Sequence, residues 1–127
     1  MYEPSIPPRP MIAIVEDDEA VLHSLEFSLE TQGYRVRAFK DAGAALASGA
    51  ITDADCVVVD YGLPELDGAA LLGILRSRGV ACPAIIVAST PGRHCRSEAA
   101  RLGVPLLEKP VMGDTLLALI GTLIGAG

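Results

Sequence analysis

Short apolar runs alternate with segments of helical periodicity along the chain. Most of these runs are four or five residues long, have no polar break, and are bounded by glycine, proline or acidic residues. Such runs are typical of strands that are buried on both faces of a sheet. One further segment alternates apolar and polar residues, which also indicates a strand. The five predicted strands are Met11–Val15, Tyr34–Ala38, Cys56–Val59, Ala84–Ala88 and Val104–Leu107.

Each predicted strand is followed by a segment with apolar residues at helical spacing. The first such segment begins behind the acidic residues 16–19 and closes at Gly33. The others are Ala42–Ser48, Glu65–Arg78, Pro91–Leu102 and Gly113–Ile124. Strands joined by helical crossovers form a parallel sheet with helices on both faces. The fold class is therefore α/β, with a single, doubly wound, five-stranded parallel sheet of expected strand order 2-1-3-4-5.

The composition is that of one acidic domain with an aliphatic core. The 127 residues carry a formal net charge of -6 and include no tryptophan. Nucleic-acid binding needs a basic face, so no direct nucleic-acid partner is expected. Residues 1–10 are proline-rich and are predicted to be a disordered leader before a single domain over 11–127. No apolar segment is long enough to cross a membrane, and three scattered cysteines indicate reduced thiols in the cytoplasm.

Acidic side chains follow the two strands that the expected order places side by side at the centre of the sheet. Asp60 ends the third strand, because Gly62 and Pro64 cannot continue a central strand. Glu16 and Asp17 follow the first strand. The carboxyl ends of these strands meet in one crevice, which therefore receives three carboxylates. Clustered carboxylates raise one another's pKa or hold a cation, and Mg²⁺ is the cation most often shared between carboxylates and a phosphate.

Lys109 follows the fifth strand and is the one basic side chain expected at the same crevice. A lysine there can contact a phosphoryl oxygen, and an aspartate beside it can act as a nucleophile that forms an acyl phosphate. No glycine-rich phosphate loop is present, so a nucleotide site is not supported. Structural alternatives stay open for each group: an aspartate that caps its own loop, acids that suit a helix dipole, and a solvated lysine. Pro110 fixes the turn after Lys109 and is a candidate for a cis peptide bond.

Together these segments resemble the receiver domain of bacterial two-component response regulators, a flavodoxin-like (βα)5 fold. The matching residues are Ile14–Asp18, Val59–Asp60, Leu63–Pro64, Asp67–Gly68 and Glu108–Pro110. The resemblance implies that Asp60 is the phosphoacceptor and that Lys109 contacts the phosphoryl group. It also implies that Mg²⁺ is bound by Glu16, Asp17, Asp60 and the backbone carbonyl of Gly62.

The resemblance further implies the partners of the chain. The phosphoryl donor would be a phosphohistidine on a sensor histidine kinase or on a histidine phosphotransfer protein. The phosphorylated chain would signal through altered protein–protein contacts. It would not be an enzyme, except toward its own phosphorylation and dephosphorylation.

Two positions depart from the family pattern. The serine or threonine that the family has at the end of the fourth strand is Ala88 here. Ser89 and Thr90 are candidate replacements for its hydroxyl: Ser89 points to the opposite face if the strand continues, and Thr90 has the parity of Ala88 but lies further along. The aromatic residue that the family has on the fifth strand is Leu106 here. A charge-assisted hydrogen bond contributes roughly 1.5–3 kcal/mol. The chemistry of phosphorylation is therefore expected to survive, while its coupling to conformational change is expected to be altered.

The last helix has no charged side chain after Asp114. This pattern fits a buried helix, and it also fits a docking or dimer surface, so a homodimer through the last helices is one expectation.

The alternative function is a degenerate receiver that docks without phosphorylation. A phosphatase would need a second acid at Gly62, and a flavin site would need a phosphate loop rich in serine and threonine. No DNA-binding segment follows Gly127, which fits a stand-alone domain or a fragment.

Overall fold

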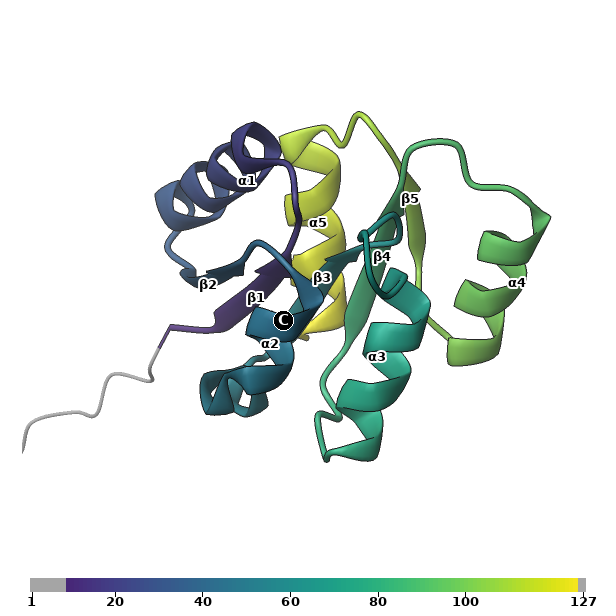
Figure 1. Ribbon diagram of the computed structural model, residues 1–127. Coiled ribbons are helices and arrows are strands. Elements are labelled where there is room, and N and C mark those ends of the chain that lie inside the picture. The colour runs from purple at the N-terminus through teal and green to yellow at the C-terminus, as the bar shows by residue number, and fades with distance from the viewer. Residues whose placement is uncertain (1–8, 126–127) are drawn as a thin grey trace, which may run out of the picture.

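Five parallel strands form one sheet in the order β2-β1-β3-β4-β5, as the sequence predicted. The strands are β1 (Met11–Val15), β2 (Arg35–Phe39), β3 (Cys56–Asp60), β4 (Ala84–Ala88) and β5 (Leu106–Glu108). The computed structural model describes residues 9–125. All but the last two residues of the leader predicted over 1–10 therefore lie outside the described residues. Figure 1 shows the sheet at the centre of the molecule, with its strands running between helices.

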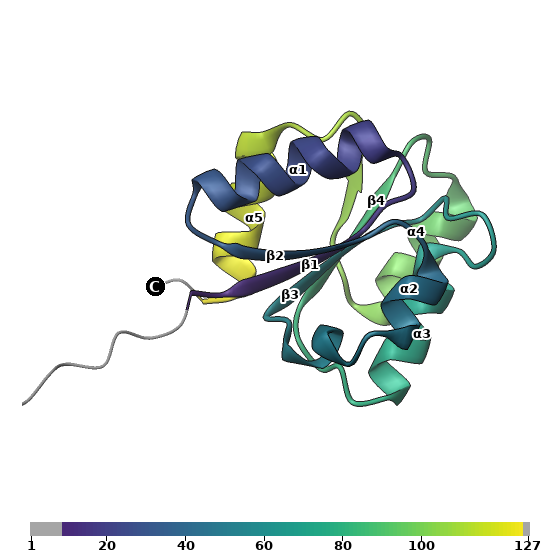
Figure 2. The same ribbon diagram turned by 60° about the vertical axis from the view of Figure 1, so that its left-hand side comes forward.

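Helices cover both faces of the sheet. They are α1 (Glu19–Thr31), α2 (Ala42–Ala47), a 3-10 helix η1 (Gly49–Asp53), α3 (Gly68–Ser77), α4 (Arg93–Leu102) and α5 (Gly113–Leu123). Figure 2 shows α1 and α5 on one face, and α2, α3 and α4 on the other. None of the helices within residues 9–125 has the length and hydropathy that are needed to span a membrane.

The central strands are buried at every position, and apart from Cys56 and Asp60 of β3 and the first residue of β1, their side chains are aliphatic on both faces of the sheet. All residues of β1, β3 and β4 are buried. Leu29 of α1 and Ile120 of α5 pack on one face, while Leu71 and Leu75 of α3 pack on the other. Burial of one such side chain stabilises the fold by about 1.5–3 kcal/mol. Two aliphatic layers thus hold the carboxyl ends of β1, β3 and β4 in a fixed arrangement.

Aspartate side chains cap the amino ends of α1, α2 and α3. Asp18 accepts hydrogen bonds from two backbone N–H groups of α1, and Asp41 accepts one from α2. Asp67 accepts one from the backbone N–H of Ala70 at 2.7 Å. The α3 helix consequently begins at Gly68, later than the start at Glu65 that the periodicity predicted.

The strand β5 is shorter than predicted and begins later. The backbone N–H of Val104 donates to the carbonyl of Ala99 at 3.0 Å, so Val104 belongs to the end of α4 and not to the sheet. Pro105 has no N–H group to donate to a neighbouring strand. The strand therefore runs from Leu106 to Glu108. β2 is likewise displaced by one residue from the predicted Tyr34–Ala38, and η1 was not predicted.

Candidate functional site

Asp60 lies at the carboxyl end of β3, near the middle of the sheet. Its side chain is 8% exposed. The backbone N–H of Gly62 donates a hydrogen bond to Asp60 Oδ1 at 3.2 Å. Gly68, at the start of α3, packs directly against the Asp60 backbone, since a Cβ at Gly68 would lie 2.5 Å from the Asp60 carbonyl oxygen. The loop after β3 and the first turn of α3 thus hold this carboxylate at a defined position.

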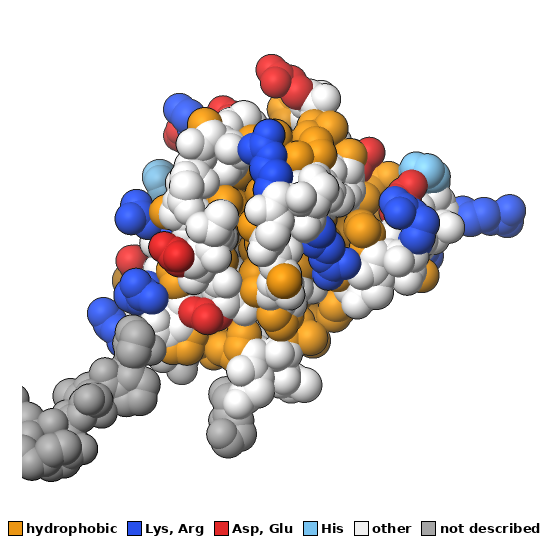
Figure 3. Space-filling view, turned by 90° about the horizontal axis from the view of Figure 1, so that it is seen from below, with side chains coloured by type: hydrophobic (Ala, Val, Ile, Leu, Met, Phe, Trp, Pro, Cys, Tyr) orange, Lys and Arg blue, Asp and Glu red, His pale blue; other side chains and the backbone are white. Residues whose placement is uncertain are grey.

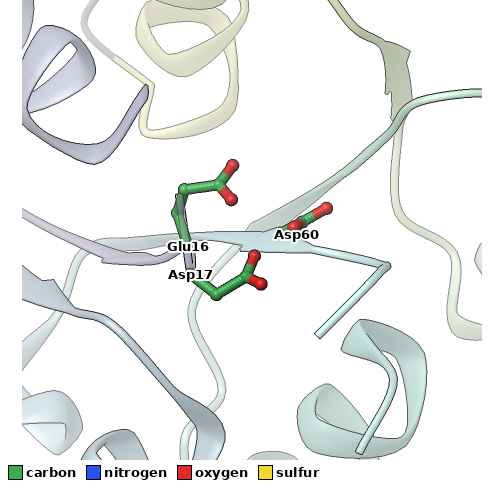
Figure 4. A group of neighbouring side chains, drawn as sticks. All are labelled: Glu16, Asp17 and Asp60. Atoms are coloured by element: carbon green, nitrogen blue, oxygen red, sulfur yellow. The ribbon is translucent and has the colours of Figure 1, made fainter. Parts of the chain in front are cut away.

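Glu16 and Asp17 bring two further carboxylates to the same place from the end of β1. One carboxylate oxygen from each of Glu16, Asp17 and Asp60 lies within 4.8 Å of the other two. Figure 4 shows these three side chains pointing into the space between the ends of β1 and β3. Glu16 is buried and its Oε2 accepts a hydrogen bond from the backbone N–H of Asp18, whereas Asp17 is exposed. Asp18 caps α1, so helix capping explains the presence of Asp18 but not that of Glu16 or Asp17.

Lys109 reaches the cluster from the end of β5, as the sequence predicted. Its backbone N–H donates to the carbonyl of Ala88 at 2.8 Å, which ties the loop after β5 to the end of β4. Lys109 Nζ lies 2.8 Å from Glu16 Oε1 and 3.5 Å from Asp60 Oδ2. The peptide bond between Lys109 and Pro110 is cis. The ammonium group therefore bridges the two buried carboxylates.

The charges in the cluster affect one another. Burial raises the pKa of the Glu16 carboxyl, and Asp60 adds to this effect, while contacts with Lys109 and the Asp18 N–H oppose it. Burial alone would lower the pKa of Lys109, but its contacts with Glu16 and Asp60 together outweigh burial and raise it. Lys109 is therefore a firmly charged ammonium. Three carboxylates face this one ammonium group, so the site keeps an excess of negative charge.

The cluster opens into a cavity of about 560 Å³. The loops after β1, β3, β4 and β5 all contribute to its walls. Among the lining residues are Ala88, Ser89, Thr90 and His94, which come from the end of β4 and the start of α4. The carboxyl edge of the sheet is where open α/β folds bind ligands. Asp60 therefore lies at the bottom of a space that can admit a small charged group.

The three carboxylates fit a small divalent cation. Mg²⁺ binds oxygen ligands and is commonly held by one or two carboxylates together with waters and phosphate oxygens. One oxygen from each of Glu16, Asp17 and Asp60 lies within 4.8 Å of the other two, so these residues would hold such an ion after a small inward movement of their side chains. The excess of negative charge also favours a cation at this position.

The remaining predicted residues occupy different surroundings. Gly62 is exposed and lines the cavity, and Ala88 is buried in its wall. Leu106 does not line this cavity; it packs, half-buried, against the hydrophobic core on the α3 face of the sheet. The predicted switch positions Ala88 and Leu106 are thus separated, with one at the site and the other beside the core.

The structural role of Gly68 was not predicted from the sequence, although this residue belongs to one of the matching motifs. The close approach of Gly68 to the Asp60 backbone depends on how the first turn of α3 packs against β3. A glycine just after a helix-capping aspartate is the one local signal of this contact, because glycine permits close backbone approach. The pairing of Lys109 with Glu16 also depends on tertiary structure and has no sequence signal of its own.

The opposite edge of the molecule, where the strands begin, has a different surface. In the view of Figure 3, acidic side chains are scattered among basic and hydrophobic ones. The α5 helix buries Leu116 and Ile120, while Leu117, Leu119 and Leu123 are partly buried against the same core. Burial against the core therefore accounts for much of the apolar surface of α5, and a homodimer through the last helices stays a prediction.

The fold and the site together define a class of protein. A five-stranded parallel sheet of this strand order, with clustered carboxylates and a lysine at its carboxyl edge, is the arrangement of a receiver domain. The family model for the response regulator receiver domain matches residues 12–121. The chain belongs to this family.

Particular relatives agree with this assignment. The chain is 36% identical over 114 residues to the transcriptional regulatory protein FixJ of Bradyrhizobium diazoefficiens, which covers 89% of this chain and 56% of the relative. It is 32% identical over 115 residues to FixJ of Azorhizobium caulinodans, with 90% and 54% covered. The chain thus spans about half the length of these curated relatives.

Solved structures share the same fold over nearly the whole chain. A CheY-like response regulator receiver domain protein from Methanospirillum hungatei JF-1 has a TM-score of 0.85 and 27% sequence identity. The match covers 93% of this chain and 95% of that chain. The non-phosphorylated HemR receiver domain of Leptospira biflexa has a TM-score of 0.83 at 27% identity, with 91% and 94% covered.

Proposed function

We propose that this chain is a phosphoacceptor switch, in which Asp60 takes a phosphoryl group from a phosphohistidine. The observation that carries this proposal is the position of Lys109 Nζ, 2.8 Å from Glu16 and 3.5 Å from Asp60, beside the exposed Asp17. A carboxylate nucleophile, a fixed ammonium group and oxygen ligands for a cation are the groups that phosphoryl transfer to an aspartate requires.

In the transfer, a carboxylate oxygen of Asp60 forms a bond to phosphorus as the bond from phosphorus to the donor imidazole nitrogen breaks. The electron pair of that bond stays on the imidazole nitrogen, which takes up a proton from water. Lys109 stabilises the charge on the transferred group as a fixed point charge. Glu16, Asp17 and Asp60 would hold Mg²⁺, with the carbonyl of Gly62 as a further ligand. The cation would offset the negative charge of the phosphoryl oxygens.

The partners follow from this chemistry and from the family. The donor would be a sensor histidine kinase or a histidine phosphotransfer protein, in the cytoplasm, and the output would be a change in protein–protein contacts. The FixJ relatives are called transcriptional regulatory proteins, which supports a role in regulation. The chain would catalyse no reaction except its own phosphorylation and dephosphorylation.

One observation favours a second candidate function. Ala88 has no hydroxyl at the end of β4, and Leu106 has no aromatic ring on β5. A receiver that docks to partners without phosphorylation would tolerate both changes. The ion pairs of Lys109 with Glu16 and Asp60 support the phosphoacceptor instead, because a docking module has no use for this costly buried cluster.

Intact-mass measurement tests the proposal. The chain is incubated with Mg²⁺ and a small phosphodonor, such as acetyl phosphate, and we expect a mass gain of one phosphoryl group. Asp60→Asn abolishes the gain, while Asp53→Asn leaves it unchanged, because Asp53 lies in η1 and does not line the cavity. No adduct in the wild type, or an adduct that persists in Asp60→Asn, would refute the phosphoacceptor and favour the docking module.

A further inference from the structure

The wall of the cavity next to Asp60 has a methyl group where a hydrogen-bond donor is needed. A phosphoryl group on Asp60 carries three peripheral oxygens, and its transfer depends on donors and cations aimed at each of them. Lys109, which lies 3.5 Å from Asp60 Oδ2, and a cation held by the carboxylates would contact two of these oxygens. Ala88 is 3% exposed, lines the cavity, and has no hydroxyl to offer to the third.

The next residue, Ser89, is held between the two functional strand ends. The carbonyl of Val87 accepts a hydrogen bond from the N–H of Tyr61, just after β3, at 2.8 Å. The carbonyl of Ala88 accepts one from the N–H of Lys109, just after β5, at 2.8 Å. Ser89 therefore follows a backbone segment that is fixed from both sides. Its exposed side chain is attached at a defined point of the cavity edge.

The register of the sheet places Ser89 on the face of the reacting groups. Val87 is the register partner of Asp60, so their side chains point to the same face of the sheet. Ser89 lies two residues beyond Val87 and has the same parity. Ala88 is the partner of Glu108, which makes Ser89 the neighbour of Lys109 one residue further on.

The surroundings of Ser89 agree with this placement. Ser89 lines the cavity above Asp60, and it also lines an adjoining groove of about 530 Å³ beside α1. Lys109 lines both of these spaces as well. Ser89 and Lys109 therefore form the wall that the cavity and the groove share, next to the carboxylates. Thr90 lines the cavity but not the groove.

We infer that the Ser89 hydroxyl donates a hydrogen bond to an oxygen of the phosphoryl group on Asp60, from the face of the sheet that Asp60 and Lys109 share. This inference rests on the proposed phosphoacceptor function. It makes Ser89 a residue that contacts the transferred group. The donor would then be supplied from one position beyond Ala88, beside Lys109.

Beryllofluoride, a phosphoryl analogue, tests the inference without turnover. The dissociation constant of the full chain for beryllofluoride in the presence of Mg²⁺ is measured from amide chemical shifts. Ser89→Ala should weaken binding by about tenfold or more, which is the effect of losing one charge-assisted hydrogen bond. Thr90→Ala is the matched control and should change it by less than about twofold. Ser89→Thr keeps a hydroxyl at the same position and should bind within about twofold of the wild type.

The outcomes separate the inference from the proposed function. Unchanged binding in Ser89→Ala, or a loss in Thr90→Ala instead, overturns the role of Ser89 while the phosphoacceptor stands. A wild type that neither binds beryllofluoride nor forms an acyl phosphate overturns both. Ser89 is exposed, so Ser89→Ala should keep the unfolding midpoint of the wild type. That measurement confirms that a weakened affinity reflects the lost hydroxyl.

Discussion

At the scale of single residues, the carboxylates of the site differ in how firmly they are held. Glu16 is 3% exposed and pairs with Lys109, and Asp60 is 7% exposed and accepts a hydrogen bond from Gly62. Asp17 is exposed, and the structure shows no ion pair for it within residues 9–125. Asp17 is therefore the group whose charge most needs a cation from solution, while Glu16 and Asp60 already share an ammonium group.

Gly68 should be more important to the site than Gly73, the other glycine of α3. Gly68→Ala would place a Cβ 2.5 Å from the Asp60 carbonyl, so α3 or the end of β3 must shift. We expect a loss of about 1–3 kcal/mol in the free energy of unfolding and slower phosphorylation. Gly73→Ala is the control, because a Cβ there meets nothing within 4 Å. It should stabilise the helix by up to about 1 kcal/mol. Urea unfolding measures both, and equal effects would contradict this contact.

Cys56 should make stability depend on alkaline pH. Burial raises the pKa of its thiol to about 12, from 9.0 in the unfolded chain. The folded state keeps the proton more tightly, so this stability is complete below pH 9.0 and is lost as the pH rises toward 12. The loss should be up to about 1.4 kcal/mol per pH unit. Urea unfolding at about pH 8 and about pH 10 should show a smaller decrease in Cys56→Ala than in the wild type. An equal decrease would mean that other groups dominate.

At the scale of elements, strands were easier to predict than helix boundaries. β1 and β4 have the predicted bounds, because each is an apolar run that ends where polar residues begin. The start of α3 was wrong because the cap at Asp67, and not the apolar periodicity, determines it. The start of β5 was wrong because the N–H of Val104 completes the end of α4. Local hydrogen bonds therefore determine where these elements begin, and the spacing of apolar residues does not reveal those boundaries.

The cap of α3 provides a test at this scale. Asp67→Ala removes the acceptor of the Ala70 N–H, and we expect a loss of about 0.5–2 kcal/mol in the free energy of unfolding. Asp53→Ala, at the last residue of η1, removes an equal charge with no capping hydrogen bond and should have a smaller effect. Thermal unfolding at neutral pH compares the two variants. Equal midpoints would show that charge, and not capping, explains the position of Asp67.

At the scale of the whole molecule, the strand order is what brings the site together. Residues 16, 60 and 109 are far apart in sequence. The order β2-β1-β3-β4-β5 places β1 beside β3, and only β4 separates β3 from β5. This convergence can be predicted from the sequence, because the polar residues follow apolar runs whose topology is constrained. The close pairing of Lys109 with Glu16 at 2.8 Å cannot be predicted in this way, since that distance depends on side-chain packing across the four strands from β1 to β5.

The excess of negative charge should make folding stability depend on Mg²⁺. A cation that binds only the folded state stabilises it by about 2.7 kcal/mol at a concentration one hundred times its dissociation constant. We expect the unfolding midpoint to rise with Mg²⁺ in the wild type. Asp17→Asn should lose most of this rise, and Asp53→Asn should keep it, because only Asp17 belongs to the carboxylate cluster. An equal rise in all three proteins would indicate nonspecific screening.

The late position of Lys109 in the chain has a consequence for quality control in the cell. The ammonium group that faces Asp60 comes from the loop after β5, so it reaches the carboxylates only once the last strand has joined the sheet. A ribosome-bound copy, or one clipped by a protease before β5, holds the nucleophile but lacks its counter-charge. Under the proposed function, such copies would lack a group that stabilises phosphoryl transfer, and only molecules with a complete sheet would have the whole site.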